Sequence, residues 1–265
     1  MPAFLPPPEG MPLASAFSRW GDHRHLGAVL AGASRVMALT GAGLSAPSGL
    51  PTYRGREGRW TVEEPIRHQA FIAGGEPALR QWERSLADLD AFAEARPNRG
   101  HAALRRLAGA RRTFVATQNV DGLHAASGFP EEDLVELHGN GRRAACLGCG
   151  ARGPLGIPEH RAAVASGHAP TCEGCGGLLK PDVVLFGDTL PAQAIARATE
   201  AARDCIVFLA AGTSLTVHPA ASLLRVAAEA GAVIVIAVDA VTPYHGAAHL
   251  LLAGDVAAHL DAAIP

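Results

Sequence analysis

Residues 35–55 read RVMALTGAGLSAPSGLPTYRG, an apolar run followed directly by a loop with closely spaced glycines. The run predicts a short buried strand over residues 35–39, and the loop begins at Gly41. Glycines at the carboxyl end of a first parallel strand let backbone N–H groups approach a pyrophosphate. The spacing differs from the common GxGxxG pattern, so the glycines alone do not define a nucleotide loop. The residues that extend the motif and make it more specific are Ser45, Pro51, Tyr53 and Arg54.

The rest of the chain alternates apolar runs with Ala-rich, Arg-studded segments of helical spacing. Continuous apolar runs are typical of parallel strands that are buried on both faces. Their alternation with helices predicts an α/β fold with a doubly wound, Rossmann-like parallel sheet. Strands are predicted over residues 35–39, 113–117, 134–137, 183–186, 205–210 and 233–238. Helices are predicted over residues 100–108, 191–203 and 220–230.

Two stretches break this alternation. Residues 56–97 read as helices and loops without a strand, and residues 139–179 are rich in Gly, Cys and Pro. We predict that the first stretch is a helical insert, that the second is a zinc-binding module, and that together they form a smaller domain. The Rossmann-like domain would then consist of residues 1–55, 98–138 and 180–265.

Two CxxC pairs lie inside the second stretch, with 22 residues between them. Four thiolates at this spacing form a closed tetrahedral site, for which zinc is the expected ion. Because sulfur fills all four positions, no position remains for water, and the ion would hold structure without taking part in chemistry. The fifth cysteine, Cys205, lies in an apolar run and is predicted to be a buried small side chain. The predicted zinc ligands are Cys146, Cys149, Cys172 and Cys175.

Length and composition limit the class of protein. At 265 residues and 48% hydrophobic content, the chain can bury a large core. A formal net charge of -2 and the lack of a basic stretch argue against nucleic-acid binding. The sequence contains neither a recognisable signal peptide nor an apolar run of about 18 residues. We therefore expect no membrane span and a cytoplasmic location.

Polar side chains follow several of the predicted strands, at the edge of the sheet where doubly wound folds bind ligands. TQNVDGLH (117–124) follows one strand, His138 ends the next, AGTSLTVHPA (211–220) follows a later one, and Asp239 ends another. A neutral imidazole at His138 could take a proton from a ribose hydroxyl. An acidic Asp239 suits a ribose diol and favours NAD over NADP. Helix caps and structural histidines are the competing interpretations of these residues.

The order of these motifs resembles that of the sirtuins, the NAD-dependent protein deacylases. The similarity extends over about residues 35–255, and two further segments, PIRHQAF (65–71) and LRQWERS (79–85), resemble the class II branch. The chain is thereby similar to a bacterial, class II-like sirtuin. The segments that carry the resemblance are GAGLSAPSGLPTYRG, TQNVDGLH, the pair His138 and Gly139, the double CxxC, KPDVVLFGD (180–188) and GTSLTVHPA (212–220).

The resemblance implies a role for each matching residue. The predicted catalytic residues are His138, as the general base, and Asn119, which with Asp121 would form a nicotinamide pocket. The predicted NAD-binding residues are Gly41, Ala42, Gly43, Ser45, Tyr53, Arg54, Gln118, Asn119, Asp121, Gly212, Thr213, Ser214 and Asp239. The predicted substrate-binding residues, which would line an acyl-lysine tunnel or pair with the substrate backbone, are Val184, Phe186, Gly187, Asp188 and Val217.

The activity implied by the resemblance is transfer of an acyl group from a protein lysine to ADP-ribose, with release of nicotinamide. NAD and one structural zinc ion would be the cofactors, and acyl-lysine proteins or peptides the partners. Two alternatives stay open: ADP-ribosyl transfer to a protein side chain in the same pocket, and a non-catalytic sensor of NAD or ADP-ribose. The chain departs from the family pattern at PTYR (51–54), where PDFR is usual, and at Asp239, where Asn is common. The acyl chain, the protein targets and the oligomeric state are left open.

Overall fold

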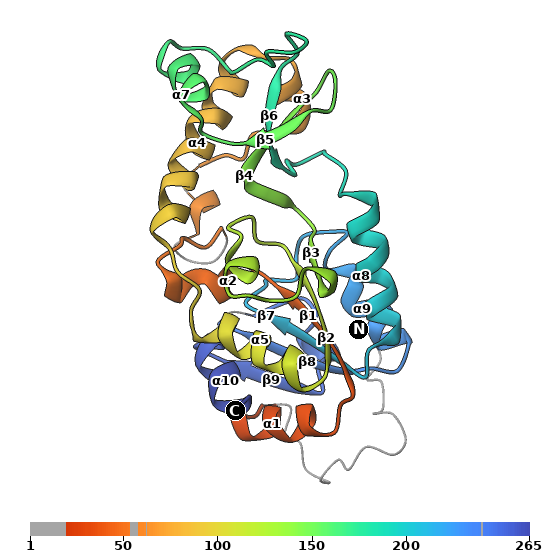
Figure 1. The fold of residues 1–265 in the computed structure, drawn as a ribbon. Helices are drawn as coiled ribbons and strands as arrows, with labels where there is room; N and C mark the ends of the chain where they lie inside the picture. The colour runs from red at the N-terminus through yellow and green to blue at the C-terminus, as the bar shows by residue number, and fades with distance from the viewer. Residues whose placement is uncertain (1–19, 54–57, 62, 240) are drawn as a thin grey trace.

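The computed structural model describes residues 20–53, 58–61, 63–239 and 241–265. Its main feature is a six-stranded sheet, with a smaller three-stranded sheet above it in Figure 1. The order of the large sheet is β3-β2-β1-β7-β8-β9, and all of its strand pairs are parallel. These strands are β1 (Arg35–Thr40), β2 (Arg112–Thr117), β3 (Leu134–Glu136), β7 (Val207–Ala211), β8 (Val233–Val238) and β9 (Leu250–Ala253). The chain builds outward from β1 in both directions, which confirms the predicted doubly wound sheet.

Helices cover both faces of this sheet, because side chains of each buried strand alternate between two apolar clusters. In β1, Val36 and Ala38 belong to one cluster, whereas Met37 and Leu39 belong to the other. The first cluster includes residues of α1 (His23–Ala31), α5 (Arg99–Ala110) and α10 (Val256–Ala263). The second includes residues of α8 (Ala192–Asp204) and α9 (Ser222–Glu229). The two short helices that follow β1 and β2 are α2 (Ala42–Ser45) and α6 (Leu123–Ala126).

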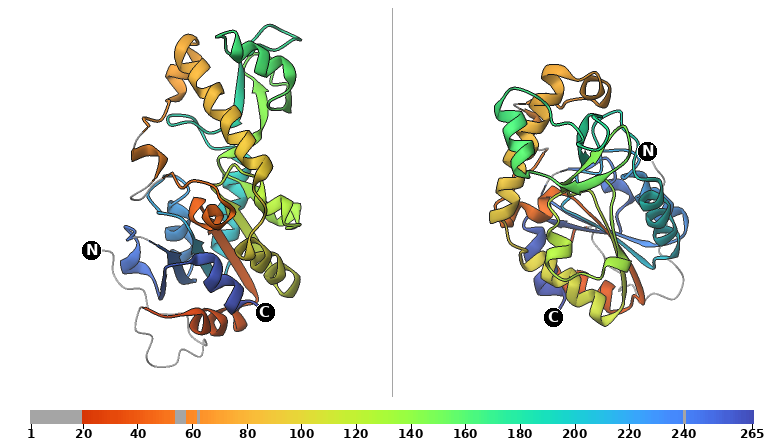
Figure 2. Two further views of the ribbon diagram at one scale, coloured as in Figure 1. Left: turned by 90° about the vertical axis from the view of Figure 1, so that its left-hand side faces the viewer. Right: turned by 45° about the horizontal axis from the view of Figure 1, so that its top comes forward.

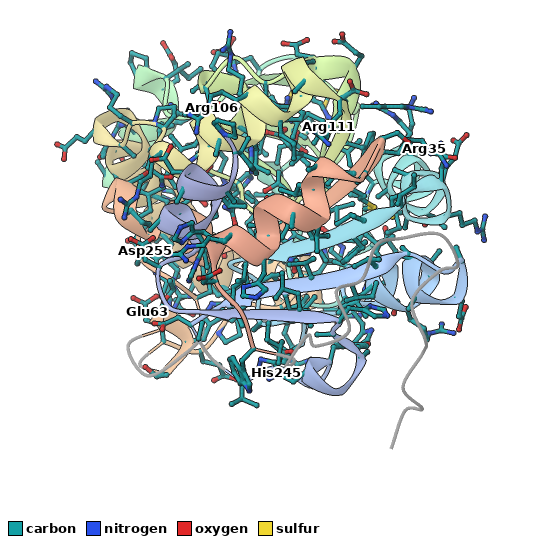
Figure 3. All side chains as sticks on the ribbon, turned by 90° about the horizontal axis from the view of Figure 1, so that it is seen from below. Arg35, Glu63, Arg106, Arg111, His245 and Asp255 are labelled. Carbon is teal, nitrogen blue, oxygen red and sulfur yellow. The ribbon has the colours of Figure 1, made fainter. Side chains whose placement is uncertain are left out.

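Arginine side chains join the three helices of the first face at their ends. Arg111, which follows α5, donates to the backbone carbonyls of Leu30 and Ala33 at the end of α1 (Figure 3). Arg106 of α5 donates to Asp261 of α10 at 2.8 Å and to the backbone carbonyl of Ile264, which follows α10, at 2.7 Å. Because a guanidinium carries five donors, each arginine satisfies carbonyl groups that helix ends leave without partners.

The small module consists of α3 (His68–Ile72), α4 (Gly75–Glu94), α7 (Pro158–Ala165) and the three-stranded sheet (Figure 2). Its strands pair antiparallel in the order β5-β4-β6 and are β4 (Gly139–Cys146), β5 (Arg152–Pro154) and β6 (Leu179–Val183). Trp82 of α4 is fully buried and donates from Nε1 to the carbonyl of Leu179 at 2.8 Å. Phe71, Leu86 and Leu155 complete the same apolar cluster, so α4 packs on the small sheet although the two are far apart in sequence.

Two details differ from the sequence-based expectation. The segment predicted as a parallel strand over residues 183–186 is not part of the large sheet, because β6 ends at Val183 and pairs antiparallel with β4. Beyond it, Val184 donates its backbone N–H to the carbonyl of His138 at 2.9 Å. Strand β9 was not predicted, since its apolar run is only four residues long. The predicted domain boundary at residue 180 falls within β6, and the domain boundaries stay a prediction.

Within the described part of the chain, none of the helices has the length and apolar character needed to cross a membrane.

Candidate functional site

A cavity of about 1020 Å³ lies along the carboxyl ends of β1, β2, β7 and β8. This is the edge at which doubly wound sheets bind ligands, and the volume is at the upper end for small-molecule sites. Residues of α4 in the small module close its opposite side. The sequence-predicted residues that line it are Gly41, Ala42, Gly43, Tyr53, Gln118, Asn119, His138, Val184, Gly212, Thr213, Ser214, Val217 and Asp239.

A second cavity of about 280 Å³ adjoins the first. It is lined by the remaining predicted substrate residues, Phe186, Gly187 and Asp188. The residues that line both cavities are Tyr53, Trp60, His138, Val184, Leu185 and Val217. His138 therefore lies at the junction, with the predicted cofactor residues on one side and the predicted substrate residues on the other.

The glycine loop is held against the loop that follows β7. Gly43 donates its N–H to the carbonyl of Gly212 at 2.9 Å, and Gly41 donates to Ala211 at 3.1 Å. A Cβ atom built on Gly43 would lie 2.9 Å from the Gly212 carbonyl oxygen and 3.0 Å from its Cα. Gly212 itself has a φ of 66°, a conformation that favours glycine. Glycine is needed here for close backbone approach, and the resulting groove fits the pyrophosphate of a dinucleotide.

Replacing Gly43 with alanine is expected to lower the free energy of unfolding by about 1–3 kcal/mol, because the new methyl group overpacks a backbone contact. Binding of NAD should weaken at the same time, since the two loops would separate. Gly109 of α5 offers a matched control, because no atom lies within 4 Å of a Cβ built there. Gly109→Ala should stabilise the helix by about 0.5–1 kcal/mol. Equal denaturant midpoints for the two variants would contradict the packing account.

Below the glycine loop, three predicted residues form a buried hydrogen-bond network. Ser45 donates from Oγ to Asp121 at 2.7 Å, and Asn119 donates from Nδ2 to Ser45 Oγ at 3.0 Å. Asn119 also donates to the carbonyl of Gly41 at 3.2 Å. Ser45 and Asp121 do not line either cavity. The other Asp121 oxygen accepts from the backbone N–H of Leu123 at 2.8 Å, so this carboxylate fixes the loop around Asn119.

Gln118 connects the ends of β2 and β7. Its Nε2 donates to Thr213 Oγ1 at 2.7 Å, and its backbone N–H donates to the carbonyl of Thr40 at 2.9 Å. Three predicted loops, which follow β1, β2 and β7, are thus joined by short bonds around one cavity. Of the predicted cofactor residues, Arg54 lies outside the described part of the chain.

His138 is positioned by its backbone and by one ring nitrogen. Nδ1 lies 3.0 Å from the carbonyl oxygen of Gln118. Because a carbonyl only accepts, Nδ1 carries the proton, and Nε2 of the neutral ring is left as an acceptor. Burial lowers the pKa of His138 below its usual value, and the bond to Gln118 offsets part of that shift. The ring is therefore a neutral base at physiological pH, at the junction of the two cavities.

A pair of buried histidines, His101 and His124, lies next to the site. Nε2 of His124 and Oγ1 of Thr40 form a hydrogen bond of 2.9 Å. The ring centroid of His124 lies 4.9 Å from that of His101. Burial lowers the pKa of His124 to about 3 and that of His101 to about 4. Both rings are neutral and packed behind the cavity, so His124 has the structural role that its position in the motif left open.

Several residues that line the larger cavity were not predicted from the sequence, among them Trp60, Ser85, Asp88 and Phe92. The last three lie at positions i, i+3 and i+7 of α4, which places them on one face of the helix. This spacing in the sequence indicates that the three side chains share one face of a helix. The neighbouring sequence does not indicate that this face lines the cavity. Trp60 stands between two predicted residues, with ring centroids 5.1 Å from Tyr53 and 5.0 Å from Phe186. Burial raises the pKa of Tyr53, which is therefore a neutral phenol.

The four predicted zinc ligands come together at one end of the small sheet. Their Sγ atoms all lie within 4.8 Å of one another, with 3.4 Å between Cys146 and Cys175 and 3.8 Å between Cys149 and Cys172. Tetrahedral Zn–S bonds of about 2.3 Å place sulfurs about 3.8 Å apart, so the set fits a zinc ion. Hydrogen bonds from the backbone N–H groups of Cys149 and Gly148 lower the pKa of Cys146 to about 6. The donors favour a thiolate, which is the form that binds metal.

Comparison with known proteins assigns the family. The Sir2 family model matches residues 41–219, more than half of the chain. An NAD-dependent protein deacetylase of Rhodopseudomonas palustris is 43% identical over 212 residues, which cover 80% of this chain and 83% of that protein. An NAD-dependent protein deacylase of Thermus thermophilus is 43% identical over 225 residues, 83% of this chain and 85% of that protein. A solved structure described as Sir2 with p53 peptide and NAD+ superimposes with a TM-score of 0.81 at 27% identity, covering 91% of this chain and 96% of that one. The chain belongs to the Sir2 family.

Proposed function

We propose that this protein is an NAD-dependent protein-lysine deacylase, which transfers an acyl group from lysine to ADP-ribose and releases nicotinamide. The observation that carries the proposal is the neutral His138, whose Nε2 is left as an acceptor where a cofactor-sized cavity meets a second cavity. The similar proteins of Rhodopseudomonas palustris and Thermus thermophilus are named as a deacetylase and a deacylase, which supports the same activity. A cytoplasmic location and acyl-lysine proteins as partners are part of the proposal.

The cavity residues divide into groups that would hold different parts of NAD. Bound NAD supplies an ADP-ribosyl group whose bond to nicotinamide can be broken. The backbone of Gly41, Ala42 and Gly43 would hold the pyrophosphate, and Gly212, Thr213 and Ser214 the adenosine half. Asp239, which lines the same cavity, would accept from the ribose diol and disfavour a 2′-phosphate. The remaining residues proposed for NAD are Ser45, Tyr53, Arg54, Gln118, Asn119 and Asp121.

The residues on the other side of His138 would hold the acylated lysine. Val184, Phe186 and Val217 are apolar, which suits a lysine stem and an acyl chain. Gly187 and Asp188 on one side and Val217 on the other would pair with the substrate backbone as an added strand. This arrangement would bring the acyl group next to the ribose of NAD. Holding the two reacting groups in contact would supply much of the rate enhancement.

His138 would move the proton in this reaction. Its Nε2 would accept a proton from a ribose hydroxyl, and the Nδ1 bond to Gln118 keeps that lone pair available. Asn119 is buried and held by bonds to Gly41 and Ser45, so its side chain is preorganised before the ligand arrives. Preorganised polar groups do not have to reorient during the reaction.

The lowered pKa of His138 has an expected consequence for pH dependence. The active form of a general base is unprotonated, and a histidine with a lowered pKa keeps that form to a lower pH than usual. We expect kcat for deacylation to fall to half of its plateau value only below about pH 6.5, the ordinary pKa of histidine. Rates measured on both sides of this pH at saturating NAD and peptide test the point. A half-maximal rate at or above pH 7 would show a base with a raised pKa and would contradict the expectation.

The test of the proposed function is incubation with NAD and an acetyl-lysine peptide, followed by mass spectrometry of all products. We expect deacetylated peptide, free nicotinamide and O-acetyl-ADP-ribose in equal amounts. A mass gain of ADP-ribose on protein or peptide, without loss of acetyl, would instead support ADP-ribosyl transfer. Binding of NAD with no turnover would support a sensor.

A further inference from the structure

An ion pair stands where the two cavities adjoin, on the side of the small module. Arg59 lies in the 3-10 helix Arg59–Thr61, and its Nη1 donates to both carboxylate oxygens of Asp88 at 2.7 and 2.9 Å. Asp88 lines the larger cavity and Arg59 lines the smaller one. Only about a fifth of each side chain is exposed, 21% for Arg59 and 23% for Asp88. The pair is therefore part of the cavity wall and lies away from the outer surface.

A row of aromatic rings connects this pair with the substrate side of His138. Phe186, a predicted substrate residue, contacts Trp60, and Trp60 contacts Tyr53. Trp60 follows Arg59 directly in the chain, and the charges of Asp88 and Arg59 both act on Tyr53. An acyl chain that entered beside Phe186 and passed His138 would meet these rings, because Trp60 contacts Phe186 and both Trp60 and Tyr53 line the two cavities. The far end of such a chain would then reach the ion pair.

The charged side chains around the Arg59–Asp88 pair are matched in sign, two guanidinium groups against two carboxylates. Arg59 is also 3.8 Å from Glu63, and Glu63 lies 3.1 Å from Arg84, which also lines the smaller cavity. Burial raises the pKa of Asp88, and the charge of Arg59 opposes that shift. Among the residues that the structure describes, both guanidinium groups that line the smaller cavity therefore already have a carboxylate partner. Neither is available as a cation for a ligand without breaking an ion pair.

We propose that Asp88 is a specificity-determining residue, which by pairing with Arg59 excludes acyl groups that end in a carboxylate. The inference rests on the proposed deacylase function. A succinyl group that enters the cavity loses the hydration of its carboxylate and needs a cation to replace it. Arginine is the best partner for a carboxylate, but Asp88 occupies Arg59 and repels a second negative charge. Acetyl and other neutral acyl groups carry no such penalty.

The test compares acetyl-lysine and succinyl-lysine on one peptide sequence. The quantity measured is the ratio of kcat/KM for succinyl to kcat/KM for acetyl. In the unmodified protein we expect this ratio to be below about 0.1. In Asp88→Asn, which keeps the shape of the side chain and removes its charge, we expect the ratio to rise by about tenfold or more, because Arg59 becomes available to the succinyl carboxylate.

Two further variants make the assignment specific. In the double variant Asp88→Asn with Arg59→Gln, the gain should disappear, since Arg59 is gone and Arg84 stays paired with Glu63 at 3.1 Å. Asp90→Asn is the matched control, because Asp90 lies on the same helix and pairs with Arg161 at 2.6 Å on the exposed side. Its ratio should equal that of the unmodified protein. Thermal unfolding of each variant verifies that it is folded, and Asp88→Ser replaces Asp88→Asn if the latter does not fold.

A ratio above 1 in the unmodified protein overturns the inference. An unchanged ratio in a folded Asp88 variant also overturns it, as does a gain that persists in the double variant. If the unmodified protein makes no O-acetyl-ADP-ribose at all, the proposed function fails and the inference fails with it. If it deacetylates and only the ratio does not move, the deacylase function stands and the role of Asp88 is wrong.

Discussion

Replacing His138 with alanine is expected to lower kcat for deacylation by about 10³-fold, within the 10²–10⁴ that general acid–base catalysis contributes. The variant loses Nε2, the atom proposed to accept the ribose proton. The contacts proposed for the pyrophosphate and adenosine lie on other loops, so the affinity for NAD should change much less than kcat. Steady-state rates with an acetyl-lysine peptide and calorimetric titration with NAD would measure the two quantities separately.

Two companion variants separate proton transfer from positioning. His138→Asn retains a side-chain amide that can donate to the carbonyl of Gln118, the present partner of Nδ1, but it offers no base. It should be as slow as His138→Ala. His168→Ala removes an exposed histidine of the small module and should match the unmodified protein. If His138→Ala kept more than about a tenth of kcat, or if His138→Asn regained it, the general-base role would be wrong.

Replacing Cys146 with serine is expected to remove the zinc ion and to destabilise the small module. Binding of structural zinc contributes about 10–16 kcal/mol in small zinc-finger peptides. A loss of roughly 5 kcal/mol or more in the free energy of unfolding is therefore expected, because three thiolates hold zinc less tightly than four. Elemental analysis gives the zinc content per chain, and thermal unfolding gives the stability.

The same change should also reduce activity, although no cysteine lies in either cavity. Cys146 is the last residue of β4, and the first residue, Gly139, follows His138 directly. Arg142 in the middle of β4 donates to the carbonyls of Asp121 at 3.0 Å and Phe92 at 2.8 Å. Loss of order in β4 would therefore be transmitted to the loop around Asn119 and to α4.

Cys205 provides the control for the zinc prediction. It is buried in the second apolar cluster, away from the four ligands, and its Sγ lies 3.3 Å from the carbonyl of Ala202. Cys205→Ala should retain one zinc ion per chain and lose only the packing of one sulfur atom. One zinc ion per chain in purified Cys146→Ser would mean that the cluster does not depend on Cys146.

Much of the fold could be predicted from local patterns. The apolar runs at β1, β2, β3, β7 and β8 were recognisable because strands buried on both faces carry few polar residues. The run at residues 183–186 has the same character, yet it lies outside the large sheet because β6 pairs with β4 instead. An apolar run indicates burial, but it does not reveal which partner strand it will pair with. That choice depends on the segment from Gly139 to Leu179, which returns the chain to β4, and on the four cysteines that come together within it.

Prediction of the site from the sequence has the same limit, because local patterns do not show which distant segments come together. Most of the predicted residues line the two cavities because each follows a strand at one edge of the sheet. Ser45 and Asp121 line neither cavity and hydrogen-bond to each other, and Ser45 also accepts from Asn119, so their predicted role at the cofactor stays a prediction. The residues of α4 were missed, since a helix in a separate stretch of sequence gives no local sign of the cavity that it closes.

On its own, the amino-acid sequence specified the α/β class, the four cysteine ligands and the polar residues at the strand ends. Each of these depends on periodicity or on fixed spacing within a short segment. Only the folded chain decided the tautomer of His138, the position of α4 against the cavity and the pairing of Arg59 with Asp88. These properties arise from contacts between segments far apart in sequence, where burial and charge act through space.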